Sequence, residues 1–437
     1  MLSDPIVALA TPPGRGALAL IRLSGRGVFA VAARVLHPFH PEPSRIVFRA
    51  RASHPATGEP LDDVLVACFA GPASYTGEDV VEVSTHGGLL VPAGVVSGFV
   101  AAGARPAVPG EFTRRAVLNG KLDLLQAEAT ADLIDAGAPA QRQRALHQLE
   151  RGLSRRLEQL RRDILELEAL IAYDIDFPEE DEGPVSEDHL TRAWHLVRDQ
   201  VGRLLATAPE GARLREGALV VIAGPPNAGK SSLFNALLGQ ERAIVTELPG
   251  TTRDAIEATA VIEGFPFRLV DTAGLRDSDD RLERLGIEVS RRYLDAADLV
   301  LFCEEHPTPG REEFLAGCVA PVVLVQTKAD LTRSDGVSVV TGAGLAELKH
   351  RLAETAFGGL VALGDVEPVV TRERHRAALR YALDELEAFW SAREQDVDAA
   401  ATATHLRAAA GALEDLIGVV TPDDVLDRVF ASFCVGK

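Results

Sequence analysis

Cysteine is scarce in this chain of 437 residues, which contains four of them. They lie far apart, at Cys68, Cys303, Cys318 and Cys434, and no two have CxxC spacing. This distribution argues against a disulfide framework and against a zinc ribbon.

Long apolar runs are also missing, because no run approaches the ~18 residues of a membrane span. Met1 is followed by Leu2-Ser3-Asp4-Pro5, without the basic start of a signal peptide. We therefore expect neither a secreted nor a membrane protein, and the cytoplasm is the expected compartment.

Positive charge is in deficit: 45 Lys and Arg face 64 Asp and Glu, a net charge of −19. Such an acidic protein is a poor generic binder of nucleic acid, so contact with RNA would need a local basic surface or a partner. With 46% hydrophobic and 25% charged residues the composition is that of a globular protein, and the length suits roughly three domains.

The texture of the sequence changes along the chain. Residues 1–118 mix short apolar runs with Gly and Pro turns, which indicates an α+β domain. Residues 119–215 and 361–437 are helical in composition, and residues 216–360 alternate strand-like and helix-like runs as βαβ units do. Because the two helical stretches share a composition that the middle lacks, we predict a helical domain interrupted by an α/β insertion.

The strongest motif is Gly224-Pro225-Pro226-Asn227-Ala228-Gly229-Lys230-Ser231, a GxxxxGKS phosphate-binding loop. It follows a strand-like run and opens a helix-like run, which is the context such a loop requires. Lys230 would reach the β- and γ-phosphates of a nucleotide, and the Ser231 hydroxyl would bind Mg²⁺.

Three companion motifs follow this loop. Residues 249–254 offer Thr252 as a second hydroxyl ligand of Mg²⁺, and residues 270–274 place Asp271 near the metal and the Gly274 N–H near the γ-phosphate. In Thr327-Lys328-Ala329-Asp330, the last carboxylate can accept two N–H bonds from guanine, which adenine cannot offer. Four such motifs in order, at spacings of ~20–60 residues, predict a guanine-nucleotide switch domain.

Three positions depart from the usual pattern of such domains. Thr327 stands where Asn is usual, so we expect a weaker nucleotide affinity, and the last base-contacting loop is assigned to Ser338. Leu275 occupies the place where many small GTPases carry a water-orienting glutamine. Since Leu275 cannot polarise water, another group must orient it.

With further motifs outside the insertion, the sequence closely resembles the MnmE (TrmE) family of bacterial tRNA-modification GTPases over essentially the whole chain. The motifs that carry this resemblance lie at residues 10–16, 21–25, 75–79, 86–88, 109–113 and 119–124, and in the terminal Phe433-Cys434-Val435-Gly436-Lys437. The resemblance implies a tetrahydrofolate-binding N-terminal domain that dimerises, a helical domain built from both flanking stretches, and an inserted P-loop, Ras-like G domain.

The resemblance also implies roles for residues of the G domain. GTP would be hydrolysed when two G domains meet, with K⁺ completing the site. The K⁺ ligands would be Asn227, Thr246, Leu248 and Thr251. Glu283 matches the catalytic glutamate, which compensates for Leu275. Asn227, Thr246 and Thr251 would also contact GTP. The other predicted GTP contacts are Ala228, Gly229, Lys230, Ser231, Ser232, Thr252, Asp271, Thr272, Ala273, Gly274, Thr327, Lys328, Asp330 and Ser338.

In the N-terminal domain, the resemblance implies that 5-formyl- or methylene-tetrahydrofolate contacts Arg22, Glu82, Lys121 and Lys437. A carboxylate suits the amino-pyrimidine edge of the pterin, and a cationic side chain suits the glutamate tail. Cys434 is a predicted catalytic residue, which could be a nucleophile, an acid, or a group that positions the one-carbon donor.

The implied function is that of a K⁺-dependent GTPase that works as a homodimer. With the FAD-dependent partner MnmG, in a heterotetramer, it would add an aminomethyl or carboxymethylaminomethyl group to C5 of the wobble uridine of tRNA. Two alternatives remain open: a ribosome-assembly or translation switch without modification chemistry, and a folate-binding sensor.

Overall fold

The computed structural model describes residues 4–41, 46–176, 187–239, 256–271, 291–332, 335–364, 367–418, 423–431 and 433–436. The chain divides into two compact units. One unit combines Met1–Ala131 with Ile417–Lys437, and the other is Asp132–Leu416.

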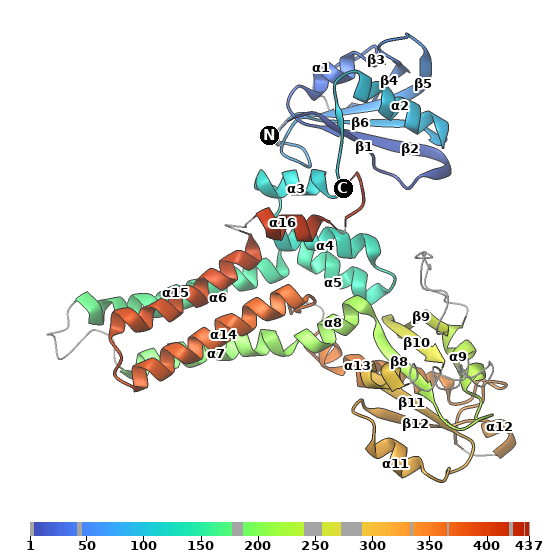
Figure 1. Cartoon of the computed structure of the whole chain (residues 1–437), viewed down its shortest axis with the longest axis vertical. Helices are drawn as coiled ribbons and strands as arrows, with labels where there is room; N and C mark the ends of the chain where they lie inside the picture. The colour runs from blue at the N-terminus through green and yellow to red at the C-terminus, as the bar shows by residue number, and fades with distance from the viewer. Residues whose placement is uncertain are drawn as a thin grey trace. The chain divides into compact units, whose positions relative to one another are not determined.

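The first unit is built on a mixed sheet with the strand order β3-β4-β5-β6-β2-β1-β7 (Figure 1). All neighbours are antiparallel except β1 and β7. The strands are β1 (Ile6–Leu9), β2 (Gly14–Ser24), β3 (Leu36–His37), β4 (Phe48–Ser53), β5 (Pro60–Phe69), β6 (Val80–Gly88) and β7 (Arg105–Pro106). The helices α1 (Val28–Ala33) and α2 (Leu90–Ala101) share one apolar core with strand residues such as Ile21, Leu23 and Val83.

The end of the chain packs into this same unit. A small apolar cluster joins α4 (Leu124–Asp135) to α16 (Asp423–Phe430) through Leu124, Leu426 and Phe430. The N-cap of α3 (Glu111–Leu118) is Gly110, where a Cβ would lie 2.9 Å from the Cβ of Phe430. This close approach requires a residue without a side chain.

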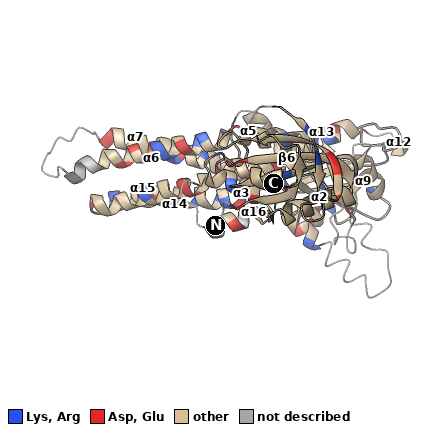
Figure 2. Cartoon of the chain, turned by 90° about the horizontal axis from the view of Figure 1, so that it is seen from above, with Lys and Arg blue, Asp and Glu red and all other residues tan. Residues whose placement is uncertain are grey.

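The second unit contains long antiparallel helices, with α6 beside α15 and α7 beside α14 (Figure 1). An apolar stripe on α6 recurs at three- and four-residue steps, and all five of its residues are fully buried: Leu157, Leu160, Ile164, Leu167 and Ile171. Basic and acidic residues are interspersed along these helices (Figure 2). Ion pairs between Arg161 and Glu414 and between Arg407 and Glu168 link α6 to α15. The helices are α5 (Pro139–Leu149), α6 (Gly152–Asp176), α7 (Glu187–Ala206), α14 (Glu373–Glu394) and α15 (Ala399–Ile417).

In the described part of the chain, we find no helix with the length and apolar character needed to cross a membrane.

The same unit holds a sheet with the order β12-β11-β8-β10-β9, parallel except for the antiparallel edge strand β9. Its strands are β8 (Ala218–Ala223), β9 (Ile256–Ile262), β10 (Phe265–Asp271), β11 (Leu299–Glu304) and β12 (Val322–Gln326). The helices around it are α8 (Ala208–Glu216), α9 (Lys230–Leu238), α11 (Arg311–Ala316), α12 (Ala329–Thr332) and α13 (Leu345–Leu363). The predicted fold class is therefore confirmed, whereas the predicted domain bounds stay a prediction.

Candidate nucleotide site and candidate folate site

The phosphate-binding loop connects the fully buried strand β8 to helix α9. Gly224 has φ +134°, and a Cβ there would lie 2.0 Å from the Cys303 carbonyl oxygen on β11. Gly229 has φ +81° and is the N-cap of α9. Both conformations need glycine, and they direct backbone N–H groups of the helix start toward one place, where they can bind phosphate oxygens.

Lys230 lies over the loop that precedes it. Its side chain is almost fully buried, and Nζ donates to the carbonyl oxygens of Gly224 at 3.1 Å and Pro225 at 2.8 Å. A phosphate oxygen carries a formal charge and is a stronger partner for an ammonium than a carbonyl. The lysine is therefore held at the loop in a position from which it can exchange its carbonyl partners for a phosphate.

The described residues also fit a Mg²⁺ ion. The exposed Ser231 is the second residue of α9, and Asp271, which is 2% exposed, ends the neighbouring strand β10. Asp271 is in register with Ile222 of β8, just before the loop. A hydroxyl and a carboxylate oxygen at the carboxyl end of two adjacent parallel strands are the hard ligands that Mg²⁺ prefers.

Thr327 joins two of the predicted motifs. It is 4% exposed, and its Oγ1 donates to the Ala228 carbonyl oxygen at 2.7 Å, while its backbone N–H donates to the Glu304 carbonyl at 2.9 Å. The hydroxyl thus ties the Thr327–Asp330 segment to the phosphate-binding loop. The expected weakening of nucleotide affinity stays a prediction.

Asp330 and Ser338, assigned from separate motifs, lie side by side. The fully buried Ser338 donates from Oγ to Asp330 Oδ1 at 2.7 Å, and the Thr341 N–H donates to that Oγ at 3.2 Å. Ser338 therefore fixes the carboxylate that would read guanine. Lys328 has φ +57° and forms a 2.8 Å ion pair with Glu305, which directly follows β11 and belongs to none of the sequence motifs.

Asn227 has φ +61°, in the left-handed region. Ala228 directly precedes Gly229, and Ser232 directly follows Ser231. The other predicted positions lie outside the described residues. They are Thr246, Leu248, Thr251, Thr252, Thr272, Ala273, Gly274, Glu283 and Lys437.

In the first unit, Arg22 and Glu82 stand directly opposite each other on β2 and β6. Arg22 donates from Nη2 at 2.7 Å and from Nε at 2.9 Å to the same oxygen of Glu82. The guanidinium also lies 5.3 Å from the ring centre of Tyr75 and 5.9 Å from that of Phe112. Two residues assigned to opposite ends of a folate are thus paired with each other beside two aromatic rings.

The C-terminal tail runs past the strand next to β2. Gly436 has φ +99°, and a Cβ there would lie 2.5 Å from the Leu9 carbonyl oxygen at the end of β1. Cys434 is exposed, as its position in the tail predicts, and its carbonyl accepts from the Gly110 N–H at 3.4 Å. Lys121 donates from Nζ to the Pro72 carbonyl at 2.9 Å, so it is anchored to a different loop.

An ionic network beneath these strands was not recognised in the sequence. Arg115 is fully buried and binds Asp4 Oδ1 at 3.1 Å, Glu78 Oε2 at 3.1 Å and Glu111 Oε1 at 2.9 Å. Glu111 also pairs with Arg105 at 2.7 Å. Burial alone would raise the pKa of Glu111, but hydrogen bonds from Arg105, the Val108 N–H and Arg115 outweigh it and lower that pKa.

One sheet carries the phosphate-binding loop, a carboxylate at the end of the adjacent strand, and an aspartate that a serine holds in place to contact the base. These features define a GTPase switch domain. Comparisons extend this to the whole chain. The family model for the GTP-binding protein TrmE N-terminus matches residues 5–121, and that for the MnmE helical domain matches residues 124–434.

Proteins named tRNA modification GTPase MnmE are similar along their full length. Those of Moorella thermoacetica and Aquifex aeolicus are 42% and 39% identical, with all of both chains covered. That of Thermus thermophilus is 42% identical, with 100% of this chain and 99% of the relative covered. The solved G domain of the T. maritima FeoB iron transporter is 30% identical over 32% of this chain and 98% of its own, with a TM-score of 0.25. The chain belongs to the MnmE family of tRNA modification GTPases.

Proposed function

We propose that this protein is a homodimeric, K⁺-dependent GTPase that modifies C5 of the wobble uridine of tRNA together with the FAD-dependent partner MnmG, in a heterotetramer. The one-carbon unit would come from 5-formyl- or methylene-tetrahydrofolate. The observation that carries the proposal is similarity along the whole chain, in both flanking parts as well as the switch domain, to proteins named for tRNA modification.

In the G domain, Lys230 and the N–H groups at the start of α9 would bind the phosphates, and Asp330, held by Ser338, would select guanine. Ser231 and Thr252 would hold Mg²⁺. Asn227 would contribute to a K⁺ site that neutralises charge developing between the phosphates, the task of an arginine finger elsewhere.

Glu283 would orient the attacking water, because Leu275 has no polar group. The Glu283→Ala variant should bind nucleotide normally, while its GTP turnover falls by about 10²-fold or more. Glu312→Ala, at an exposed carboxylate on α11 of the same domain, is the matched control and should leave turnover unchanged. Wild-type turnover in Glu283→Ala would refute the assigned role.

K⁺ dependence is tested by measuring GTP turnover in K⁺, Rb⁺ and Na⁺ over a range of protein concentrations. We expect the rate per molecule to rise with concentration and to be high in K⁺ and Rb⁺ but not in Na⁺, since two G domains must meet around the ion. Equal rates in Na⁺ and K⁺ would contradict the proposal.

In the N-terminal domain, folate would exchange the Arg22–Glu82 pair for contacts with its own charged groups. Glu82 would accept from the amino-pyrimidine edge of the pterin, and the cationic groups of Arg22 and Lys121 would bind the carboxylates of the glutamate tail. Lys437 would approach the pterin region. The aromatic rings of Tyr75 and Phe112 beside Arg22 support this, because a flat pterin can lie against an aromatic face.

A substitution at Cys434 distinguishes two hypotheses, namely a modification enzyme and a switch that lacks modification chemistry. The Cys434→Ser variant should retain GTP binding and K⁺-stimulated hydrolysis, yet fail to restore wobble-uridine modification in a deletion strain. Full restoration of the modification by this variant would show that the thiol has no essential role.

A further inference from the structure

The chain crosses twice between the helical part of the second unit and its nucleotide-binding sheet, first from α8 into β8 and then from α13 back to α14. Leu214 and Val369 both belong to the apolar core of the sheet. Arg215 directly follows Leu214, and Arg372 lies three residues after Val369. Each arginine is therefore next to the point where its crossing meets that core.

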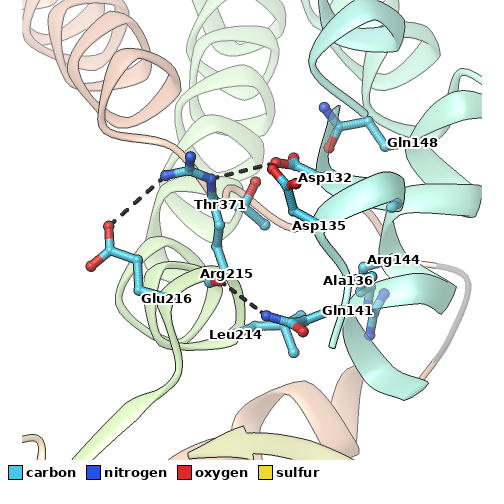
Figure 3. Close-up of a pocket in the computed structure, with 11 residues that line it drawn as sticks. Asp132, Asp135, Ala136, Gln141, Arg144, Gln148, Leu214, Arg215, Glu216 and Thr371 are labelled. Carbon is cyan, nitrogen blue, oxygen red and sulfur yellow. Dashed lines mark hydrogen bonds and ion pairs between the residues drawn. The ribbon is translucent and has the colours of Figure 1, made fainter. Parts of the chain in front are cut away.

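One carboxylate contacts both crossings. Asp132, near the end of α4, accepts from Arg372 Nη2 at 2.6 Å and lies 3.5 Å from Arg215 Nε, with the same oxygen atom in both pairs. Figure 3 shows the Asp132 carboxylate directed toward the Arg215 guanidinium. These arginines are 157 residues apart in sequence (372 − 215). The Asp132 side chain therefore connects two segments that no contact between sequence neighbours could join.

Helix α5 holds the same two crossings through side chains. Gln141 accepts the Gly137 and Ala138 N–H groups at its own helix start and donates from Nε2 to the Arg215 carbonyl at 3.0 Å. Arg144 donates to the carbonyls of Gly364 at 2.6 Å and Glu367 at 2.7 Å on the returning crossing.

Helix α5 also touches the sheet itself. The Ala140 N–H donates at 3.0 Å to the carbonyl of Gly264, in the tight turn between β9 and β10. These two strands are paired along their whole length, from Phe265 opposite Ile262 to Asp271 opposite Ile256. Asp271 lies at the candidate Mg²⁺ site, so the open end of this hairpin is at the nucleotide site, while its turn contacts α5.

The region where residues 132–144 contact the two crossings and the turn at Gly264 is polar. A cavity of about 200 Å³ lies within it, and most of its lining side chains can ionise or form hydrogen bonds, among them Asp132, Asp135, Gln141, Arg144, Arg215 and Thr371 (Figure 3). Polar contacts around a cavity can switch between discrete sets of partners. A close-packed apolar core resists such a change.

We propose that residues 132–144 form a latch that links the nucleotide state of the G domain to the helical part of the unit, through the turn at Gly264 and both crossings. Asp132 is its central positioning residue, because it is the group that both crossings share. A change in nucleotide at the hairpin's open end moves the turn relative to α5 and breaks or forms the latch contacts.

The test is hydrogen exchange of the Ala138 and Ala140 amides in the full-length protein, with GDP and with a non-hydrolysable GTP analogue plus Mg²⁺. We expect exchange rates in the wild type to differ by about tenfold between the two nucleotides, the ratio given by about 1.4 kcal/mol. In Asp132→Asn the amides should exchange rapidly in both states, with a difference below about twofold, while Asp132→Glu should restore the difference.

Asp135→Asn is the matched control, because Asp135 is an exposed carboxylate that lines the same cavity, and it should behave like the wild type. Gln141→Leu removes the bond to the Arg215 carbonyl without changing charge, but it also removes the acceptor of the Ala138 N–H, so this variant is measured at the Ala140 amide alone. There it should reproduce the effect of Asp132→Asn. Equal exchange with both nucleotides in the wild type, or a retained difference in Asp132→Asn, would overturn the proposal. So would loss of GDP binding by Asp132→Asn, since Asp132 would then support the nucleotide site itself.

Discussion

Thr327 offers a sharp test of how the guanine-reading segment is attached to the phosphate-binding loop. Thr327→Val has nearly the same shape but removes the hydroxyl that donates to the Ala228 carbonyl at 2.7 Å in a buried position. Leaving a buried acceptor without its partner costs about 1–3 kcal/mol. Because this bond joins two parts of the nucleotide site, we expect GDP affinity to fall by about tenfold, as about 1.4 kcal/mol requires.

Thr327→Ser is the matched control, because it retains the hydroxyl and loses one methyl group, worth about 0.8 kcal/mol of buried apolar surface. It should bind GDP almost as tightly as the wild type. Titration with a fluorescent GDP analogue gives the affinities, and urea unfolding gives the stabilities. Equal affinity in Thr327→Val and the wild type, or equal weakening in both variants, would refute the role assigned to the hydroxyl.

Three further changes probe the guanine site, the ionic network and the tail. Asp330→Asn should shift preference from GTP towards XTP by at least about tenfold in competition binding, because the new amide can donate to the C2 carbonyl of xanthine; unchanged discrimination would exclude this residue as the base reader. Glu111→Gln should destabilise the protein by about 3 kcal/mol at neutral pH, because the fully buried Arg115 loses a buried charged partner. Since the folded pKa of Glu111 is lowered from 4.5, this difference in unfolding free energy should shrink as the pH falls below that value, and a difference independent of pH would contradict the assignment. Gly436→Ala places a Cβ 2.5 Å from the Leu9 carbonyl oxygen, so limited proteolysis should cut the tail faster while GTP turnover is unchanged, and wild-type protection would argue against docking of the tail.

The sequence predicts the fold class well because each part of the chain contains a recognisable local pattern. The apolar stripe from Leu157 to Ile171 has the period of a helix, and the strand, glycine loop and helix around Lys230 occur in the required order. Asp330 and Ser338 were also identified from short motifs, and they hydrogen-bond to each other.

The contacts between distant segments could not be read from the sequence. Arg22 and Glu82 were identified separately, but their ion pair depends on the register of β2 against β6, which no local pattern specifies. The Asp132–Arg372 contact joins residues 240 positions apart (372 − 132) and depends on how the helical part packs on the sheet. Arg115 would be expected at the surface from composition alone, and only the three carboxylates around it allow its burial.

The proposed function of this GTPase is modification of the wobble uridine of tRNA. Mass spectrometry of nucleosides from tRNA tests it most directly, in cells lacking the protein and in the same cells supplied with the wild type, Cys434→Ser or Thr327→Ser. We predict that the C5-modified wobble uridine disappears without the protein and returns with the wild type and Thr327→Ser but not with Cys434→Ser. An unchanged level of the modified nucleoside in the deletion strain would contradict the account.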